Sequence, residues 1–183
     1  TRVLGWLQAR HEARAEPAVL LAAQLSEPDA VSRATAADPK ELTRQQAAVA
    51  LWISRRYRVA PEPISRLVKE AWHVGERAGL DPTLILAIMA IESSFNPFAQ
   101  STVGAQGLMQ VMPFWRSESG TPDDNLIDVA TNIRYGCAIL SAYLTREDGN
   151  LMHALARYNG SRGKLWYPEK VFNAWERYWY VKA

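Results

Sequence analysis

Apolar side chains recur along this chain at the three- and four-residue spacing of helices, and Pro, Gly, Asp or Asn interrupts the pattern. In residues 38–57, Asp38 suits the N-cap and Pro39 suits the first helical position. The apolar surface of this predicted helix comes from Leu42, Val49, Leu51, Trp52 and Ile53. Two shorter helices are predicted upstream, at residues 5–14 and 17–25.

Five further helices follow from the same rules. The first begins at residue 61 and ends at Gly79, because glycine adopts the positive φ of a C-terminal cap without strain. The predicted starts of the others are Asp81 with Pro82, Asp128, Asn150 and, in the first turn of the last helix, Pro168.

One stretch stands apart because it has no polar face. Every residue from Leu84 to Ile91 is apolar, which indicates a helix surrounded by protein rather than one lying on the surface. Glu92 follows this run directly, and Pro97 prevents the helix from continuing. Residues 96–107 are loop and turn material with room for a short hairpin. The fold class predicted is therefore mainly α, with a small irregular or β-hairpin insertion and an N-terminal helical segment.

Composition excludes several classes of function. The 183 residues are 48% hydrophobic and 22% charged, with a net charge of +2, so we expect a globular protein that is not a nucleic-acid partner. No apolar run reaches the roughly 20 residues that span a bilayer. Cys137 lies among apolar positions at helical spacing, which predicts an inert buried thiol. The dispersed histidines and the lack of a glycine-rich phosphate loop indicate neither a metal nor any other cofactor.

Glu92 is an ionisable residue placed directly after a run of apolar residues. Apolar neighbours and the negative end of a helix both disfavour an ionised carboxylate, so its pKa is expected to be raised. A carboxyl group that stays neutral near pH 7 can donate a proton, as cleavage of a glycosidic bond requires. From the position alone, a solvated helix-end glutamate explains the residue as well.

The residues that follow Glu92 carry a specific resemblance. The stretch ESSFNPFAQSTVGAQGLMQVMP, residues 92–113, resembles the signature of lytic transglycosylases with a soluble-type, goose-lysozyme-like catalytic domain. Farther on, ALARYNGSRGKLWYPEKV resembles two later motifs of the same family, although Arg157 precedes Tyr158 and Gly160 follows Asn159 directly. The resemblance implies a lysozyme-like domain, which we place at residues 61–183. Residues 1–60 lie outside the motifs and are predicted to form a helical segment packed on that domain.

The family also implies roles for individual residues. Glu92 matches the single catalytic carboxylate, and Ser101 matches the serine that approaches the N-acetyl group of the substrate. The other positions that match the glycan groove are Gln110, Met112, Tyr158, Asn159 and Tyr167. Phe114, Trp115 and Trp166 are further aromatic candidates for contact with sugar rings, whereas Met112 and Tyr158 also suit plain core positions.

The resemblance implies peptidoglycan as substrate and cleavage of the MurNAc–GlcNAc β-1,4 bond without water, giving 1,6-anhydro-MurNAc ends. Glu92 would act first as acid and then as base, with the acetamido group of the substrate replacing a second carboxylate. The nearest other acids lie in a polar loop and are expected to be solvated: Glu118, Asp123, Asp124 and Asp128. Positive charge near the Tyr158 motif could bind the carboxylates of peptide stems or could simply belong to a solvated loop; it comes from Arg157, Arg162 and Lys164.

Two other functions share these features and stay open. A goose-type muramidase would hydrolyse the same bond, and a non-catalytic peptidoglycan-binding module would bind the glycan without cutting it. The expected location is the periplasm or cell envelope. The sequence leaves room for a cell-envelope protein partner and for a membrane anchor upstream of Thr1.

Overall fold

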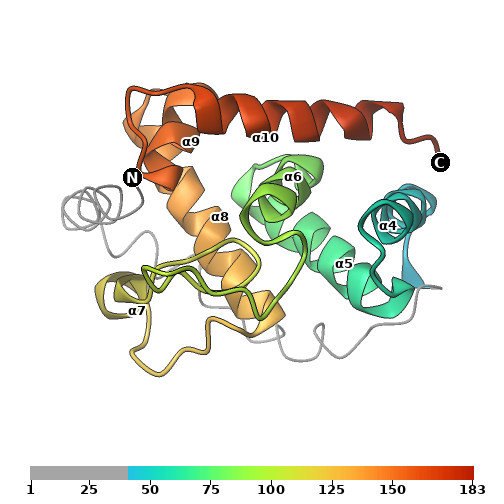
Figure 1. The fold of residues 1–183 in the computed structure, drawn as a ribbon, viewed down its shortest axis with the longest axis horizontal. Helices are drawn as coiled ribbons and strands as arrows, with labels where there is room; N and C mark the ends of the chain where they lie inside the picture. Colours follow the sequence, from blue (N-terminus) through green and yellow to red (C-terminus); the bar gives the residue numbers. More distant parts are fainter. Residues whose placement is uncertain (1–40) are drawn as a thin grey trace.

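The computed structural model describes residues 41–183 and consists of helices joined by short turns and one long irregular loop (Figure 1). The helices are α4 (Arg44–Tyr57), α5 (Pro61–Ala78), α6 (Pro82–Ser93), α7 (Phe114–Ser119), α8 (Val129–Arg146), α9 (Leu151–Asn159), α10 (Trp166–Glu176) and the 3-10 helix η2 (Arg177–Tyr180). The mainly α prediction is confirmed. The helices predicted at residues 5–14 and 17–25 lie outside the described residues.

Most of the predicted helix boundaries are confirmed. Gly79 ends α5 with φ of 69°, and Asp81 caps α6 by accepting a hydrogen bond from the Thr83 amide. Asp128 and Asn150 cap α8 and α9 in the same way. Each cap satisfies a backbone N–H that has no partner inside its helix.

The predicted start of α4 is wrong. The α-helix begins at Arg44 rather than near Asp38, because Thr43 accepts a hydrogen bond from the Gln46 amide and Gln46 returns one to the Thr43 amide. This reciprocal capping box fixes the N-terminus more firmly than a single aspartate does.

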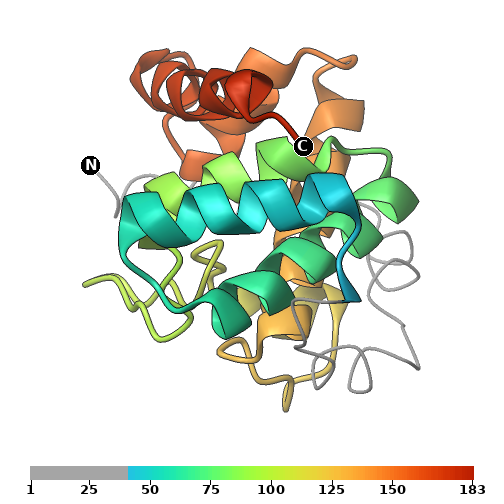
Figure 2. The same cartoon turned by 90° about the vertical axis from the view of Figure 1, so that its right-hand side faces the viewer.

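α6 lies at the centre of the described fold. It packs against α5 on one side and α10 on the other, and the two views show it enclosed by neighbouring helices (Figures 1 and 2). Its residues from Leu84 to Ala90 are all buried, as the unbroken apolar run predicts. Each buried Leu, Ile or Met side chain among them contributes roughly 1.5–3 kcal/mol, so this helix is a rigid base for the residue at its end.

α4 joins the same apolar core. Val49, Ala50 and Ile53 are buried in one cluster with residues of α5, α6, α8, α9 and α10. α4 packs along α5, and Trp52 meets Tyr178 of η2 edge to face at 5.0 Å between ring centroids. The described part of the N-terminal segment thus packs on the rest, while the domain boundary near residue 60 remains a prediction.

The segment between α6 and α8 is irregular. Within residues 41–183 its pairing is limited to two isolated antiparallel bridges, Gln100 with Gln106 and Gln106 with Val111, so the insertion is irregular rather than a hairpin. The short helix α7 was not predicted from the sequence; its Trp115 is buried against Phe114 and Tyr143. No helix of residues 41–183 combines the length and apolar character needed to cross a bilayer.

Candidate active site

Glu92 is half-buried in the last turn of α6, where the chain turns sharply. Ser94 and Phe95 both adopt left-handed backbone conformations, with φ of 50° and 63°. Such a conformation costs a non-glycine residue roughly 1–2 kcal/mol. Burial of Phe95 against Tyr57, with ring centroids 4.8 Å apart, offsets this cost. The turn therefore ends the helix directly behind the carboxylate.

Tyr167 brings the C-terminal helix to this carboxylate. Its hydroxyl donates a hydrogen bond to Glu92 Oε1 at 2.6 Å, across 75 positions of sequence. The Tyr167 ring is buried in the first turn of α10, next to Trp166, which is 49% exposed. The first turn of α10 thus places the buried Tyr167 phenol at Glu92 and leaves the Trp166 indole exposed to solvent.

Tyr158 approaches the same carboxylate from α9. Its hydroxyl donates to the Met109 carbonyl at 2.7 Å. Burial raises the pKa of Tyr158 well above its usual value, and the negative charge of Glu92 raises it further. The phenol therefore stays protonated, and Glu92, Tyr158 and Tyr167 converge from three different helices.

Asn132, a buried residue of α8, holds the loop beside Glu92. Its side-chain amide donates to the carbonyls of Gln106 and Leu126 at 2.8 and 2.7 Å and accepts from the Met109 amide at 2.8 Å. Gly107 is required beneath it, because its φ is 76° and a Cβ there would lie 2.3 Å from the Asn132 amide nitrogen. Asn132 was not predicted from the sequence, although a polar residue among the apolar positions of a helix indicates a buried hydrogen-bonding role.

Ser93 adds a second tie between this loop and α6. Its hydroxyl lies within hydrogen-bond distance of the Leu108 carbonyl, at 2.8 Å, and of the Met89 carbonyl, at 3.1 Å. It follows Glu92 immediately, so it fixes the loop against the turn that carries the carboxylate. Its place in the Glu-Ser pair was recognised, but this positioning role was not predicted.

Two predicted substrate-binding residues are engaged within the loop itself. Gln110, with φ of 52°, donates through Nε2 to the carbonyls of Ala99 and Gly107 at 3.1 and 3.0 Å. The Ser101 hydroxyl oxygen accepts from the Ala105 amide at 3.0 Å, which leaves its own hydrogen as a donor. Both side chains shape the loop, whatever else they contact.

Three of the predicted residues share a small cavity. Gln110, Met112 and Tyr158 line a space of about 30 Å³, together with Trp115, and it has room for about one water molecule. Trp115 is only 3% exposed, so the expectation that it contacts sugar rings is wrong: its ring stacks on Phe114 and makes an edge-type contact with Tyr143. Trp166 is the exposed alternative.

The unusual residues around Tyr158 have structural roles. Arg157 is buried and donates through Nε to the carboxylate of Glu147, which caps the end of α8. Arg157 therefore forms a buried ion pair with Glu147 and is not exposed to bind the carboxylates of a peptide. Gly160, with φ of 73°, ends α9 directly after the half-buried Asn159, and the Ser161 amide bonds back to the Ala156 carbonyl.

The acidic residues of the 118–128 loop include two with evident structural partners. Asp124 accepts hydrogen bonds from Tyr135 and Thr121, and Asp128 caps α8. Burial opposes ionisation of Asp124, but its hydrogen bonds outweigh that effect and lower the pKa below its usual value. Among residues 41–183, no three His, Cys, Asp or Glu side chains gather in a way that would hold a metal ion. Cys137 is buried, and burial raises the pKa of its thiol beyond any physiological range.

Comparison with known proteins identifies relatives of this chain. The family model described as Transglycosylase SLT domain matches residues 72–178. Membrane-bound lytic murein transglycosylase C of Yersinia enterocolitica is 39% identical over 106 residues, covering 49% of this chain and 30% of that protein. The protein of the same name from Salmonella typhimurium is 43% identical over 103 residues, covering 48% and 29%. The chain thus spans about 30% of the length of the curated relatives it matches.

A solved structure is also similar. An inactive mutant of the lytic transglycosylase Slt from Pseudomonas aeruginosa aligns with a TM-score of 0.47 and 26% identity, over 76% of this chain and 29% of that one.

Proposed function

The chain belongs to the Transglycosylase SLT domain family, and from this premise we propose that it is a lytic transglycosylase acting on peptidoglycan. The bond cleaved is the β-1,4 linkage between MurNAc and GlcNAc. The observation that carries the proposal is the hydrogen bond from Tyr167 to Glu92, because it ties the motif at the start of α10 to the carboxyl group at the end of α6.

Glu92 is the proposed general acid. The oxygen that leaves C1 of MurNAc needs a proton, and the Glu92 carboxyl supplies it as the C1–O bond breaks. Tyr167 fixes one carboxyl oxygen, Oε1, and thereby the orientation of the whole carboxyl group. Preorganised geometry of this kind avoids the cost of orienting the acid during the reaction.

The substrate takes the place of a second carboxylate. Its acetamido oxygen attacks C1 as the leaving group departs, and the Ser101 hydroxyl, whose hydrogen remains available as a donor, orients that acetamido group. Ionised Glu92 then accepts the proton of the C6 hydroxyl, whose oxygen bonds to C1 and displaces the acetamido oxygen. The product is a 1,6-anhydro sugar, and Glu92 recovers its proton.

The glycan is held by residues around this carboxyl group. We propose that Gln110, Met112, Tyr158 and Asn159 shape the groove beside Glu92 and that Trp166 stacks against a sugar ring with its open face. Gln110 and Tyr158 act mainly by fixing the loop backbone, since their polar groups bond to loop carbonyls.

Mass spectrometry of digested peptidoglycan tests the proposal. Anhydro ends, each one water lighter than a reducing end, are expected from the active protein and not from Glu92→Gln. Reducing ends only would make the protein a hydrolysing muramidase. Binding to peptidoglycan with no release of fragments would make it a non-catalytic wall-binding module. In keeping with this substrate, we propose that the protein works in the periplasm or elsewhere in the cell envelope.

A further inference from the structure

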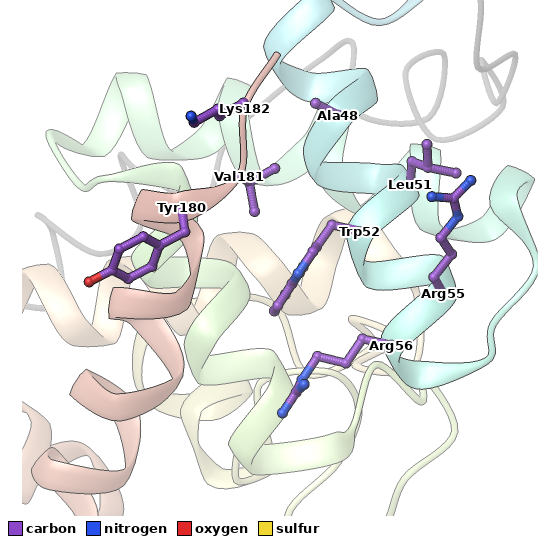
Figure 3. A pocket seen from close by; sticks show the side chains of 8 residues that line it. All are labelled: Ala48, Leu51, Trp52, Arg55, Arg56, Tyr180, Val181 and Lys182. Carbon is purple, nitrogen blue, oxygen red and sulfur yellow. The ribbon is translucent and has the colours of Figure 1, made fainter.

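A second hollow lies between α4 and the segment that follows α10 (Figure 3). Its volume is about 600 Å³, which is in the range of sites that hold small ligands or short peptides. Leu51 and Trp52 line it from α4, and Val181 lines it from the C-terminal segment. Leu51 is 48% exposed, so the groove offers apolar surface to a ligand.

The charges around this groove all have the same sign. Arg55, Arg56 and Lys182 line it, and none of the lining residues between 41 and 183 is acidic. All three side chains are exposed. Arg56 lies over the Trp52 ring, with its guanidinium carbon 5.6 Å from the ring centroid. This contact holds one cation at the apolar wall while leaving its N–H groups free to bind an anion.

The groove is separate from Glu92. Tyr167 lies in the first turn of α10, whereas Val181 follows η2 at the opposite end (Figure 1). At 1.5 Å per helical residue the two ends are about 20 Å apart. The end of the groove formed by Val181 therefore lies away from the reaction site.

We infer that this groove binds a short peptide carrying free carboxylates, and that its occupant is the peptide stem of peptidoglycan. The inference rests on the proposed function, since a glycan strand held at Glu92 extends past the active site and carries such stems along its length. The stems combine carboxylates with small apolar side chains, which matches cations around an apolar wall. The three cations are among the residues that line a hollow, and a hollow suits a short peptide better than a membrane surface.

Calorimetric titration of the whole chain with a synthetic stem peptide tests this inference. Arg56→Gln is expected to weaken binding about tenfold, since it removes a charge-assisted hydrogen bond to a carboxylate. Arg56→Lys retains the charge and should lose less. The matched control is Arg44→Gln, which removes an exposed arginine from the first turn of the same helix, outside the groove. It should change the affinity less than twofold.

Two ligand comparisons complete the test. A stem peptide with amidated carboxylates is expected to bind at least tenfold more weakly than the free acid, and added salt should weaken only the free acid. Equal binding of the two peptides would overturn the inference, as would equal effects of Arg56→Gln and Arg44→Gln. Binding to anionic lipid vesicles with none to the peptide would overturn it in favour of a membrane.

The inference and the proposed function fail separately. Stem binding is measured without cleavage and is expected to be unchanged in Glu92→Gln. Arg56-dependent binding in a protein that never releases glycan fragments would contradict the proposed function alone. Formation of anhydro ends by a protein that does not bind the peptide would contradict this inference alone.

Discussion

Two glutamates of this protein lie at helix C-termini and have opposite partners. Glu92 occupies the last turn of α6 and accepts a hydrogen bond from the neutral phenol of Tyr167. Glu147 caps α8 and accepts one from the guanidinium of Arg157. The negative end of a helix dipole disfavours both carboxylates, and the two hydrogen bonds differ in the charge of their donors.

The partner of Glu147, Arg157, favours the ionised form of its carboxylate. The hydrogen bond from Arg157 lowers the pKa of Glu147 below its usual value, and the charges of Arg157 and Arg162 add to this against a smaller opposing effect of burial. His153 also lies near, with Nδ1 3.6 Å from Glu147 Oε2. The phenol of Tyr167 is a neutral donor, so its hydrogen bond orients the Glu92 carboxyl group without bringing a positive charge to it.

The largest expected effect concerns Glu92 itself. Glu92→Gln keeps the shape of the side chain but removes its proton, so we expect release of glycan fragments to fall at least 10³-fold, within the range attributed to a general acid. The thermal midpoint should change little because the side chain is only half-buried. Rates and melting curves are compared with those of Glu176→Gln, an exposed glutamate at the end of α10. Retained activity in Glu92→Gln would show that Glu92 is not the general acid.

The second effect should appear in stability rather than catalysis. Glu147→Gln removes the carboxylate that accepts a hydrogen bond from the buried Arg157, and we expect a loss of about 2 kcal/mol in unfolding free energy at pH 7. Urea denaturation measures it, with Asp148→Asn at the exposed neighbouring position as control. A loss of activity per folded molecule as large as that of Glu92→Gln would erase the contrast between the two glutamates.

The pH dependence of this second effect has a defined sign. Because the pKa of Glu147 is lowered in the folded protein, its ionised form stabilises the fold above the ordinary glutamate pKa of 4.5. This stabilisation is lost as the pH falls through the folded pKa. The stability difference between the parent protein and Glu147→Gln should therefore shrink below about pH 4.5, and a difference that grew on acidification would contradict the ion-pair role.

A smaller effect is expected from the partner of Glu92. Tyr167→Phe removes one donor from the carboxyl group while keeping the buried ring, and we expect kcat to fall about tenfold with little change in KM. Tyr178→Phe is the matched control, since it removes a buried phenol hydroxyl from η2 at the far end of the C-terminal segment. Equal rates for the two variants would show that Tyr167 has no special role in positioning the acid.

The smallest effect is expected at Trp166, the exposed aromatic residue of the candidate site. Trp166→Ala should raise KM for glycan strands about three- to fivefold, because stacking of an aromatic face on a sugar ring contributes to binding but not to proton transfer. Trp179→Ala removes another exposed indole, 65% accessible, from the opposite end of the segment. If both substitutions raise KM equally, Trp166 is not a specific sugar platform.

Local features of the fold were readable from the sequence, whereas its long-range contacts were not. The unbroken apolar run predicted a buried α6, and single side chains predicted the caps at Asp81, Asp128 and Asn150. The capping box at Thr43 was overlooked because Asp38 and Pro39 offered a competing start. α7 was missed because one and a half turns give too little periodicity to recognise.

The site shows the same division. Motif resemblance predicted Glu92 and Tyr167, but their hydrogen bond joins residues 75 positions apart and depends on how α6 packs against α10. The clamp by Asn132 spans 23 and 26 positions for the same reason. The prediction for Trp115 was wrong because the residue type alone does not show whether an aromatic side chain lines a groove or packs in the core.

The bond between Tyr167 and Glu92 also supplies a built-in spectroscopic reporter. The electron density of a phenol ring responds to the charge on the oxygen that its hydroxyl contacts, so a fluorine placed on the Tyr167 ring would shift its resonance when the Glu92 carboxyl gains or loses a proton. The acid would thereby be followed through a turnover by a nucleus that is not itself part of the reaction.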